Sequence, residues 1–170
     1  NWKTKNYYLD SEKFTTNAQI AKIGEYFADC IRENGIQYDV IVGLAYHGIA
    51  FSTATSCSLF QKYGVTKDFC FDRKVPDSRG RKICGHTLKD GEKVIIVDDL
   101  ITTGKTLCER IDRLKEEADI EVVEVVVIAN LENDEIRENG LGTKMLEERY
   151  GTKIYSIITD KDISGYLYKI

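Results

Sequence analysis

The amino-acid sequence predicts an α/β fold with a mostly parallel, twisted sheet and helices on both faces. Short apolar runs alternate along the chain with segments in which apolar residues recur at helical spacing. The apolar runs are continuous, as in strands that are buried on both faces of a parallel sheet. Right-handed crossovers join such strands and helices. The carboxyl ends of the strands then meet at one edge, where ligands of these sheets bind.

A helix is predicted over residues 17–34 and a strand over residues 38–44. Asn17 is expected to cap the start of the helix, and Gly35 is expected to end it. One helical face carries the apolar residues Ile20, Ile23, Phe27 and Ile31. The strand "YDVIVGL" is apolar enough to lie inside a parallel sheet.

The middle of the chain continues the alternation of strands and helices. A turn and a helix that ends near Gly64 lead to a strand over residues 67–72. Residues 73–86 show no apolar periodicity and are predicted to form a loop. A strand over residues 93–98 and a helix over residues 105–118 follow.

The last third contains the strongest β-branched run, "VVEVVVIAN", which predicts a strand over residues 122–130. A shorter helix near residues 141–150 and a strand over residues 153–158 complete the pattern. Neither a repeat nor a linker divides the chain, so residues 1–170 are expected to form a single domain.

Composition excludes several classes of protein. The chain has 170 residues, of which 42% are hydrophobic and 31% charged, as in an ordinary globular domain. No apolar run approaches the roughly 20 residues that span a bilayer. The net charge of −4 argues against nucleic acid as the main partner. Five widely spaced cysteines without a C-x-x-C pair favour reduced thiols, and we expect a cytoplasmic protein that binds neither nucleic acid nor membrane. The chain begins with Asn1 rather than Met, which allows for residues trimmed upstream.

The segment "VIIVDDLITTGKT" places two adjacent carboxylates, Asp98 and Asp99, at the end of a buried strand. Neighbouring carboxylates disfavour each other's ionisation unless hydroxyls, other donors or cations compensate them. The segment from Thr102 to Thr106 supplies hydroxyls and backbone N–H groups at a helix start, where phosphate binds readily. The sequence argues against a nucleotide-hydrolysing P-loop, because the first Gly of that motif would fall at Asp99. Sugar hydroxyls or Mg²⁺ are the expected partners of the carboxylates.

Two further loops are expected at the same edge of the sheet. The turn in "GLAYHG" lies between Gly43 and Gly48, and glycines permit close approaches of the backbone. The segment 73–82 carries five basic residues, Arg73, Lys74, Arg79, Arg81 and Lys82, and is predicted to be an anion-binding lid. Phosphates suit the basic loop and the helix start, and hydroxyls suit the carboxylates. A phosphorylated ribose that carries a diphosphate satisfies all three loops.

These residues resemble a known family. "VIIVDDLITTGKT" is similar to the phosphoribosyl-diphosphate (PRPP) motif of the type I phosphoribosyltransferases. "NYYLD", "GLAYHGIA", "CFDRK" and "YSIITDKDI" resemble segments of the orotate phosphoribosyltransferases within that family. The resemblance implies the type I phosphoribosyltransferase fold, with a small N-terminal hood over residues 1–16. It also implies transfer of phosphoribose from PRPP to orotate in de novo pyrimidine biosynthesis, Mg²⁺ carried by PRPP, and a homodimer whose basic loop is shared between sites.

The resemblance also assigns roles to positions in this sequence. It implies that Asp98, Asp99, Lys74 and Arg79 are catalytic, and it places Leu9, Tyr8 and Thr102 at the base. PRPP would be bound by Tyr46, His47, Arg73, Lys74, Asp98, Asp99, Leu100, Ile101, Thr102, Thr103, Gly104, Lys105 and Thr106. Within this set the diphosphate would lie against Tyr46, His47, Arg73 and Lys74. The Ala45–Tyr46 peptide bond is expected to be cis, and no metal ligand is assigned in the protein itself.

The sequence departs from the family at three places. Asp77 stands where the mobile loop of the family has a Lys, and Arg79 stands where that loop has a His. His47 replaces the Lys of the family's "AYKG" segment. The segment "NLENDE", residues 130–135, lacks the Arg that the family offers to orotate. Two alternatives therefore remain open: transfer to a different nucleobase, and a non-catalytic sensor of PRPP or nucleotides on the same fold.

Overall fold

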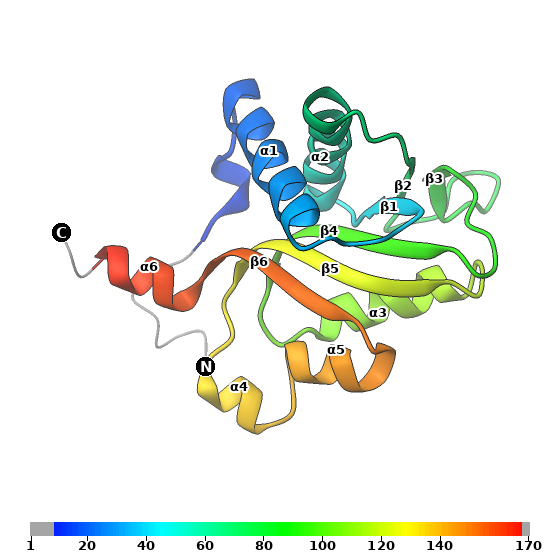
Figure 1. Ribbon diagram of the computed structural model, residues 1–170. Coiled ribbons are helices and arrows are strands. Elements are labelled where there is room, and N and C mark those ends of the chain that lie inside the picture. Colours follow the sequence, from blue (N-terminus) through cyan, green and yellow to red (C-terminus); the bar gives the residue numbers. More distant parts are fainter. Residues whose placement is uncertain (1–8, 168–170) are drawn as a thin grey trace.

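The computed structural model describes residues 9–167, which form a six-stranded sheet with helices on both faces (Figure 1). The strand order is β3-β2-β1-β4-β5-β6, and β3 is an antiparallel edge strand on an otherwise parallel sheet. The strands are β1 (Val40–Gly43), β2 (Asp68–Asp72), β3 (Ile83–Gly85), β4 (Lys93–Ile101), β5 (Glu121–Asn130) and β6 (Lys153–Thr159). The predicted α/β class is confirmed.

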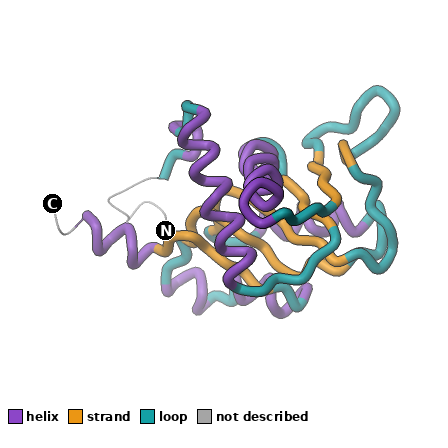
Figure 2. The backbone as a smooth tube through the Cα atoms, turned by 45° about the horizontal axis from the view of Figure 1, so that its top comes forward, coloured by secondary structure: helices purple, strands orange, loops and turns teal. Residues whose placement is uncertain are grey.

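The described residues contain seven helices, four of which cover the two faces of this sheet. They are the 3₁₀ helix η2 (Ser11–Lys13) and the α-helices α1 (Asn17–Glu33), α2 (His47–Tyr63), α3 (Lys105–Lys115), α4 (Asp134–Glu138), α5 (Thr143–Tyr150) and α6 (Asp160–Leu167). Helices α1 and α2 lie side by side on one face, whereas α3 and α5 cover the other (Figures 1 and 2). None of the helices within residues 9–167 combines the length and the apolar character needed to cross a membrane.

Alternate strand residues bury their side chains on opposite faces. On one face Val94, Ile96 and Val125 pack with Ile111 of α3 and Leu146 of α5. The other face contains a second buried cluster with α1 and α2, formed among others by Ile41, Ile95, Val97, Val126, Phe27 and Phe51. Burial on both faces explains why the strands read as continuous apolar runs.

Several predicted boundaries were wrong for identifiable reasons. Thr16, not Asn17, caps α1: its hydroxyl accepts a hydrogen bond from the Gln19 backbone N–H, and the Gln19 side chain bonds back to Thr16. The helix predicted over residues 105–118 ends at Lys115. Gly64 ends α2 in the left-handed conformation at φ +65°, as the sequence indicated.

Two errors bear directly on the site. Strand β4 continues to Ile101, because Asp98, Leu100 and Ile101 stay paired with β5, so the two carboxylates lie within the strand rather than at its end. The predicted loop 73–86 contains β3, which pairs with β2 although its three residues show no strand pattern. Helices α4 and α6 were not predicted either.

Candidate active site

A pocket of about 240 Å³ lies at the carboxyl end of the central strands. It is lined by Leu44, Ala45, Asp98, Asp99, Leu100, Ile101, Thr102, Thr103, Gly104, Thr106, Leu107 and Arg110. These residues come from the end of β1, the end of β4 and the start of α3. The structure therefore brings the predicted turn after β1 together with the carboxylate and threonine loop.

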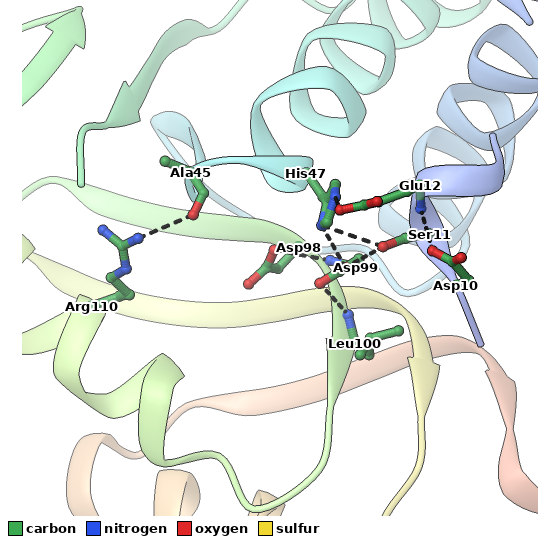
Figure 3. A network of polar contacts seen from close by, with 9 residues as sticks. All are labelled: Asp10, Ser11, Glu12, Ala45, His47, Asp98, Asp99, Leu100 and Arg110. Carbon is green, nitrogen blue, oxygen red and sulfur yellow. Dashed lines mark hydrogen bonds and ion pairs between the residues drawn. The ribbon is translucent and has the colours of Figure 1, made fainter. Parts of the chain in front are cut away.

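The two carboxylates at the end of β4 differ in their surroundings. Burial, together with the negative charge of Asp99, raises the pKa of Asp98 to about 8. The backbone N–H of Asp99 donates to Asp98 Oδ1 at 3.0 Å, and the N–H of Leu100 donates to Asp99 Oδ1 at 2.9 Å (Figure 3). Within residues 9–167 no ion pair joins Asp98 to a cationic side chain. Asp98 thus has unused capacity to accept hydrogen bonds or a cation.

Asp99 is held by two side chains from distant segments. Its Oδ2 accepts a 2.6 Å hydrogen bond from the Ser11 hydroxyl of η2. The Nδ1 atom of His47, the first residue of α2, lies 3.0 Å from the same oxygen. His47 Nε2 in turn lies 3.8 Å from Glu12 Oε1 (Figure 3). The N-terminal segment therefore reaches the site and orients one of its carboxylates.

A buried ion pair holds the turn after β1. Arg110 of α3 pairs with Asp72 at the end of β2, and both side chains are almost fully buried. Asp72 Oδ1 accepts the Ala45 N–H at 2.6 Å, and Arg110 Nη2 donates to the Ala45 carbonyl at 3.0 Å. The Ala45–Tyr46 peptide bond is cis, as the resemblance implied. The two charges fix both polar groups of Ala45 at the wall of the pocket.

Gly43 and Gly48 allow this turn to lie directly against β4. A Cβ atom on Gly48 would lie 2.6 Å from the Val97 carbonyl oxygen, immediately before Asp98. A Cβ atom on Gly43 would lie 2.1 Å from Ser52 Oγ and 2.6 Å from the Gly48 carbonyl oxygen. Only glycine fits such approaches, so both residues of "GLAYHG" have a packing role.

The threonine loop forms the start of α3. Gly104 caps the helix at φ +73°, which leaves the first backbone N–H groups directed at the pocket end. The Thr103 carbonyl accepts a 2.8 Å hydrogen bond from the Gly142 N–H. Behind it, the buried carboxylate of Glu132 bonds to Thr143 at the start of α5. The loop is thus supported from below while Thr102 and Thr106 remain exposed.

The basic loop between β2 and β3 is folded around Asp77. The Oδ1 atom of Asp77 accepts hydrogen bonds from the backbone N–H groups of Arg79 at 2.9 Å and Arg81 at 3.0 Å. Its Oδ2 atom accepts a hydrogen bond from Arg81 Nε at 2.7 Å. These contacts hold the pKa of Asp77 below its usual range. Lys82 pairs with Glu116 and Glu117 just after α3. At the position where the resemblance implies a Lys, this chain therefore has a carboxylate that closes a turn.

The chain matches the phosphoribosyl transferase domain over residues 11–158. The chain belongs to the phosphoribosyltransferase family. It is 34% identical to the orotate phosphoribosyltransferase of Clostridium botulinum (strain Alaska E43 / Type E3), over 95% of this chain and 73% of that protein. The orotate phosphoribosyltransferase of Agathobacter rectalis is 30% identical over 95% of this chain and 74% of its own. A crystal structure of the Francisella tularensis orotate phosphoribosyltransferase superimposes with a TM-score of 0.78 at 26% identity, covering 96% of this chain and 77% of that one.

In this phosphoribosyltransferase the predicted residues are distributed unevenly around the pocket. Lys74 Nζ lies 4.3 Å from the centre of the Tyr46 ring, which brings these two predicted diphosphate ligands together. Arg73, with Arg81 and Lys82, lines a separate pocket of about 280 Å³. Arg79 lies on the exposed part of the basic loop, and neither Arg73 nor Arg79 lines the carboxylate pocket.

The two predicted base contacts at the N-terminus have different outcomes. Tyr8 lies outside the described residues, whereas Leu9 is half-buried and packs against the core cluster beneath α1 and α2. In the segment without the family Arg, Glu132 is buried, and Arg137 Nε lies 3.4 Å from its Oε2. A guanidinium from α4 therefore approaches the segment in which the sequence lacks one.

The sequence did not point to Ser11, Asp72 or Arg110. Arg110 alone carried a signal, since it is a charged residue on the apolar face of α3 between Leu107 and Leu114. Ser11 and Asp72 had none, because their partners lie 88 and 38 residues away along the chain.

Proposed function

We propose that this chain transfers the 5-phosphoribosyl group of PRPP to orotate, giving orotidine 5′-monophosphate and diphosphate in pyrimidine nucleotide synthesis. The observation that carries the proposal is one pocket that combines the Asp98 and Asp99 carboxylates with the N-terminus of α3. Its 34% identity to an orotate phosphoribosyltransferase over 95% of the chain supports orotate as the acceptor.

The pocket can bind each part of a phosphorylated ribose. The 2′- and 3′-hydroxyls donate to the carboxylates of Asp98 and Asp99. The 5′-phosphate accepts hydrogen bonds from backbone N–H groups and hydroxyls between Thr102 and Thr106, where the dipole of α3 favours an anion. Ser11 and His47 keep Asp99 in one orientation before the ligand arrives.

The reaction needs stabilisation of charge more than proton transfer. As diphosphate leaves, positive charge develops on the ribose ring, and fixed carboxylates beneath it stabilise that charge. We assign Lys74, whose Nζ lies 4.3 Å from the centre of the Tyr46 ring, to the departing diphosphate, with Arg79 of the basic loop as a second donor. No covalent nucleophile is required.

The donors in the pocket also fit Mg²⁺ that enters with PRPP. Carboxylate and hydroxyl oxygens are the ligands that Mg²⁺ prefers, and Asp98 is buried beside Asp99 without a cationic partner among the described residues. When bound, the ion would neutralise diphosphate charge and so favour its departure. Asp98 and Asp99 are the residues that would lie nearest to it.

The proposal extends to assembly. We place residues 1–170 in one domain, with residues 1–16 as a hood near the base, including Tyr8 and Leu9. We also propose a cytoplasmic homodimer whose basic loops reach the neighbouring site. The loop is suited to this role because Arg73, Arg79 and Arg81 do not contribute to the pocket of their own chain. Closure of the loop would exclude water, which competes with the base as acceptor.

A single assay tests the proposed reaction. The protein is mixed with Mg²⁺ and PRPP together with orotate or with each purine or pyrimidine base, and diphosphate release is followed. We expect diphosphate to be released when orotate is the base and not when any of the other bases is used. Release only with another base would overturn orotate as the acceptor, and PRPP binding without turnover of any base would indicate a sensor. A variant with both Asp98→Asn and Asp99→Asn serves as control, and its affinity for PRPP is expected to be weaker.

A further inference from the structure

The carboxylate of Glu132 is buried behind the threonine loop (residues 102–106), between the end of β5 and the start of α4. Its side chain is 1% exposed. Oε1 accepts the backbone N–H of Thr143, the first residue of α5, and Oε2 accepts the Thr143 hydroxyl at 3.1 Å. Arg137 Nε and Asn130 Nδ2 approach Oε2 at 3.4 Å and 3.5 Å. These groups are all donors, and an ionised carboxylate can accept from each of them.

Gly142 lies between this carboxylate and the threonine loop. It adopts φ +71° and ψ −135°, a conformation that residues with a Cβ atom avoid, and a Cβ atom there would overlap Glu132 Oε1. On its other side, the Gly142 N–H donates to the Thr103 carbonyl at 2.8 Å. The Gly142 carbonyl oxygen lies 3.1 Å from the place that a Cβ atom on Gly104 would take. The backbone of Gly142 is therefore packed against Glu132 on one side and the loop on the other.

The position of Thr103 and Gly104 decides where the first N–H groups of α3 point. Gly104 caps this helix at φ +73°, and no side chain bonds to the N–H groups of its first turn as a cap. These N–H groups have no partner within the helix, so they are the donors available to an anion. Donors that are held in place before a ligand arrives save the cost of ordering them on binding. A restraint on Thr103 and Gly104 therefore favours binding of a phosphate at this helix start.

We propose that Glu132 is a positioning residue for the 5′-phosphate of PRPP. It holds the start of α5, and the backbone of Gly142 passes this restraint to Thr103 and Gly104. The inference rests on the proposed function, in which the loop binds that phosphate. Glu132 is not among the residues that line the pocket, so it acts through the loop and not by contact with the ligand. Its effect is confined to the 5′-phosphate end, whereas the diphosphate is assigned to Lys74.

Binding of different parts of the substrate tests this role. Glu132→Gln keeps the size of the side chain but replaces one acceptor oxygen by a donor that faces other donors. We expect the dissociation constants of PRPP and of ribose 5-phosphate, measured by titration calorimetry with Mg²⁺, to rise at least about fivefold. Diphosphate should bind as it does to the native chain, and the KM for orotate should not change, whereas a general loss of the fold would weaken all of these ligands. The matched control is Glu138→Gln, at an exposed position of α4, which should leave every constant unchanged.

Hydrogen exchange tests the restraint without any ligand. The Gly142 amide, which is bonded to Thr103, should exchange with deuterium at least about five times faster in Glu132→Gln than in the native chain. Thr143→Ala removes the hydroxyl but keeps the N–H bond to Glu132, so it should fold like the native chain and change PRPP affinity and exchange in the same direction, by about twofold.

The outcomes separate this role from the proposed function. Native PRPP affinity and native Gly142 exchange in both Glu132→Gln and Thr143→Ala would overturn the positioning role, while turnover by the native chain would still support the proposed function. A native chain that binds neither PRPP nor ribose 5-phosphate would overturn the proposed function and this role with it.

Discussion

The Ser11 hydroxyl donates a 2.6 Å hydrogen bond to Asp99 Oδ2 and thereby ties the N-terminal segment to the end of β4. This bond helps to hold Asp99 beside Asp98, although adjacent carboxylates repel each other. The same oxygen faces His47 Nδ1 at 3.0 Å, so one carboxylate links η2, α2 and β4. The orientation of a proposed ribose ligand therefore depends on a residue that lies 88 positions earlier in the chain.

Ser11→Ala is expected to weaken PRPP binding about tenfold, because a hydrogen bond to a charged group contributes about 1.5 kcal/mol or more. The KM for PRPP and the dissociation constant from calorimetry should rise together, with little change for orotate. Ser11→Thr keeps the hydroxyl and should restore most of the affinity. Lys13→Gln, at an exposed position of the same 3₁₀ helix, is the control. An unchanged PRPP affinity in Ser11→Ala would contradict the role given to Ser11.

Asp98 makes the stability of the ligand-free protein depend on pH. Its folded-state pKa of about 8 lies above the usual unfolded value of about 3.9, so between these values the folded chain retains a proton that the unfolded chain has lost. Stability from this group is fully present below pH 4 and is lost as pH rises toward 8. Relative to the native chain, Asp98→Asn should therefore gain stability between pH 5 and pH 8, by about 1.4 kcal/mol for each pH unit.

Urea unfolding at both pH values, without PRPP, measures this difference. Glu109→Gln, which removes an exposed carboxylate from α3, should follow the native chain at each pH. If Asp98→Asn lost stability relative to the native chain as pH rose from 5 to 8, the raised pKa of Asp98 would be refuted. Asp99→Asn should lower the pKa of Asp98, because the charge of Asp99 contributes to raising it. The loss of stability on ionisation of Asp98 should then end at a lower pH than in the native chain.

The sheet could be predicted from the sequence because most of its buried strands consist of continuous runs of apolar residues. The run from Val94 to Val97 needs no knowledge of its neighbours to be recognised as a buried strand. Strand β3 is different, since its three residues are half-buried or exposed and become a strand only by pairing with β2. The extension of β4 past Asp98 likewise depends on the length of β5.

The part of the site whose functional residues are adjacent in the sequence could be predicted. Asp98, Asp99 and the threonine loop are adjacent in the sequence and line one pocket. Contacts formed between remote segments could not be read in this way. The contact between Asp72 and Arg110 spans 38 residues, and no spacing rule connects them. The turn-closing role of Asp77 was also hidden, because it depends on the backbone of Arg79 and Arg81.

Asp77→Ala is expected to loosen the basic loop. The carboxylate accepts two backbone N–H groups and one guanidinium N–H, and its loss leaves those donors to solvent. Each such bond contributes about 1 kcal/mol, so the amides of Arg79 and Arg81 should exchange with deuterium at least about five times faster. Ser78→Ala, at the exposed neighbouring position, should leave exchange unaltered. Equal exchange rates in Asp77→Ala and the native chain would show that Asp77 does not close the turn.

The buried ion pair between Arg110 and Asp72 gives the largest expected loss of stability. Arg110→Met leaves the Asp72 carboxylate buried without its cation, which costs about 3–5 kcal/mol, and also frees the Ala45 carbonyl at the pocket wall. The matched control is Arg149→Met, because Arg149 pairs with Asp112 on the surface, where such pairs contribute about 0–1 kcal/mol. Combining Arg110→Met with Asp72→Asn removes both charges and should recover part of the loss. Denaturant unfolding measures each variant, and equal losses for Arg110→Met and Arg149→Met would show that the buried pair does not hold this part of the site.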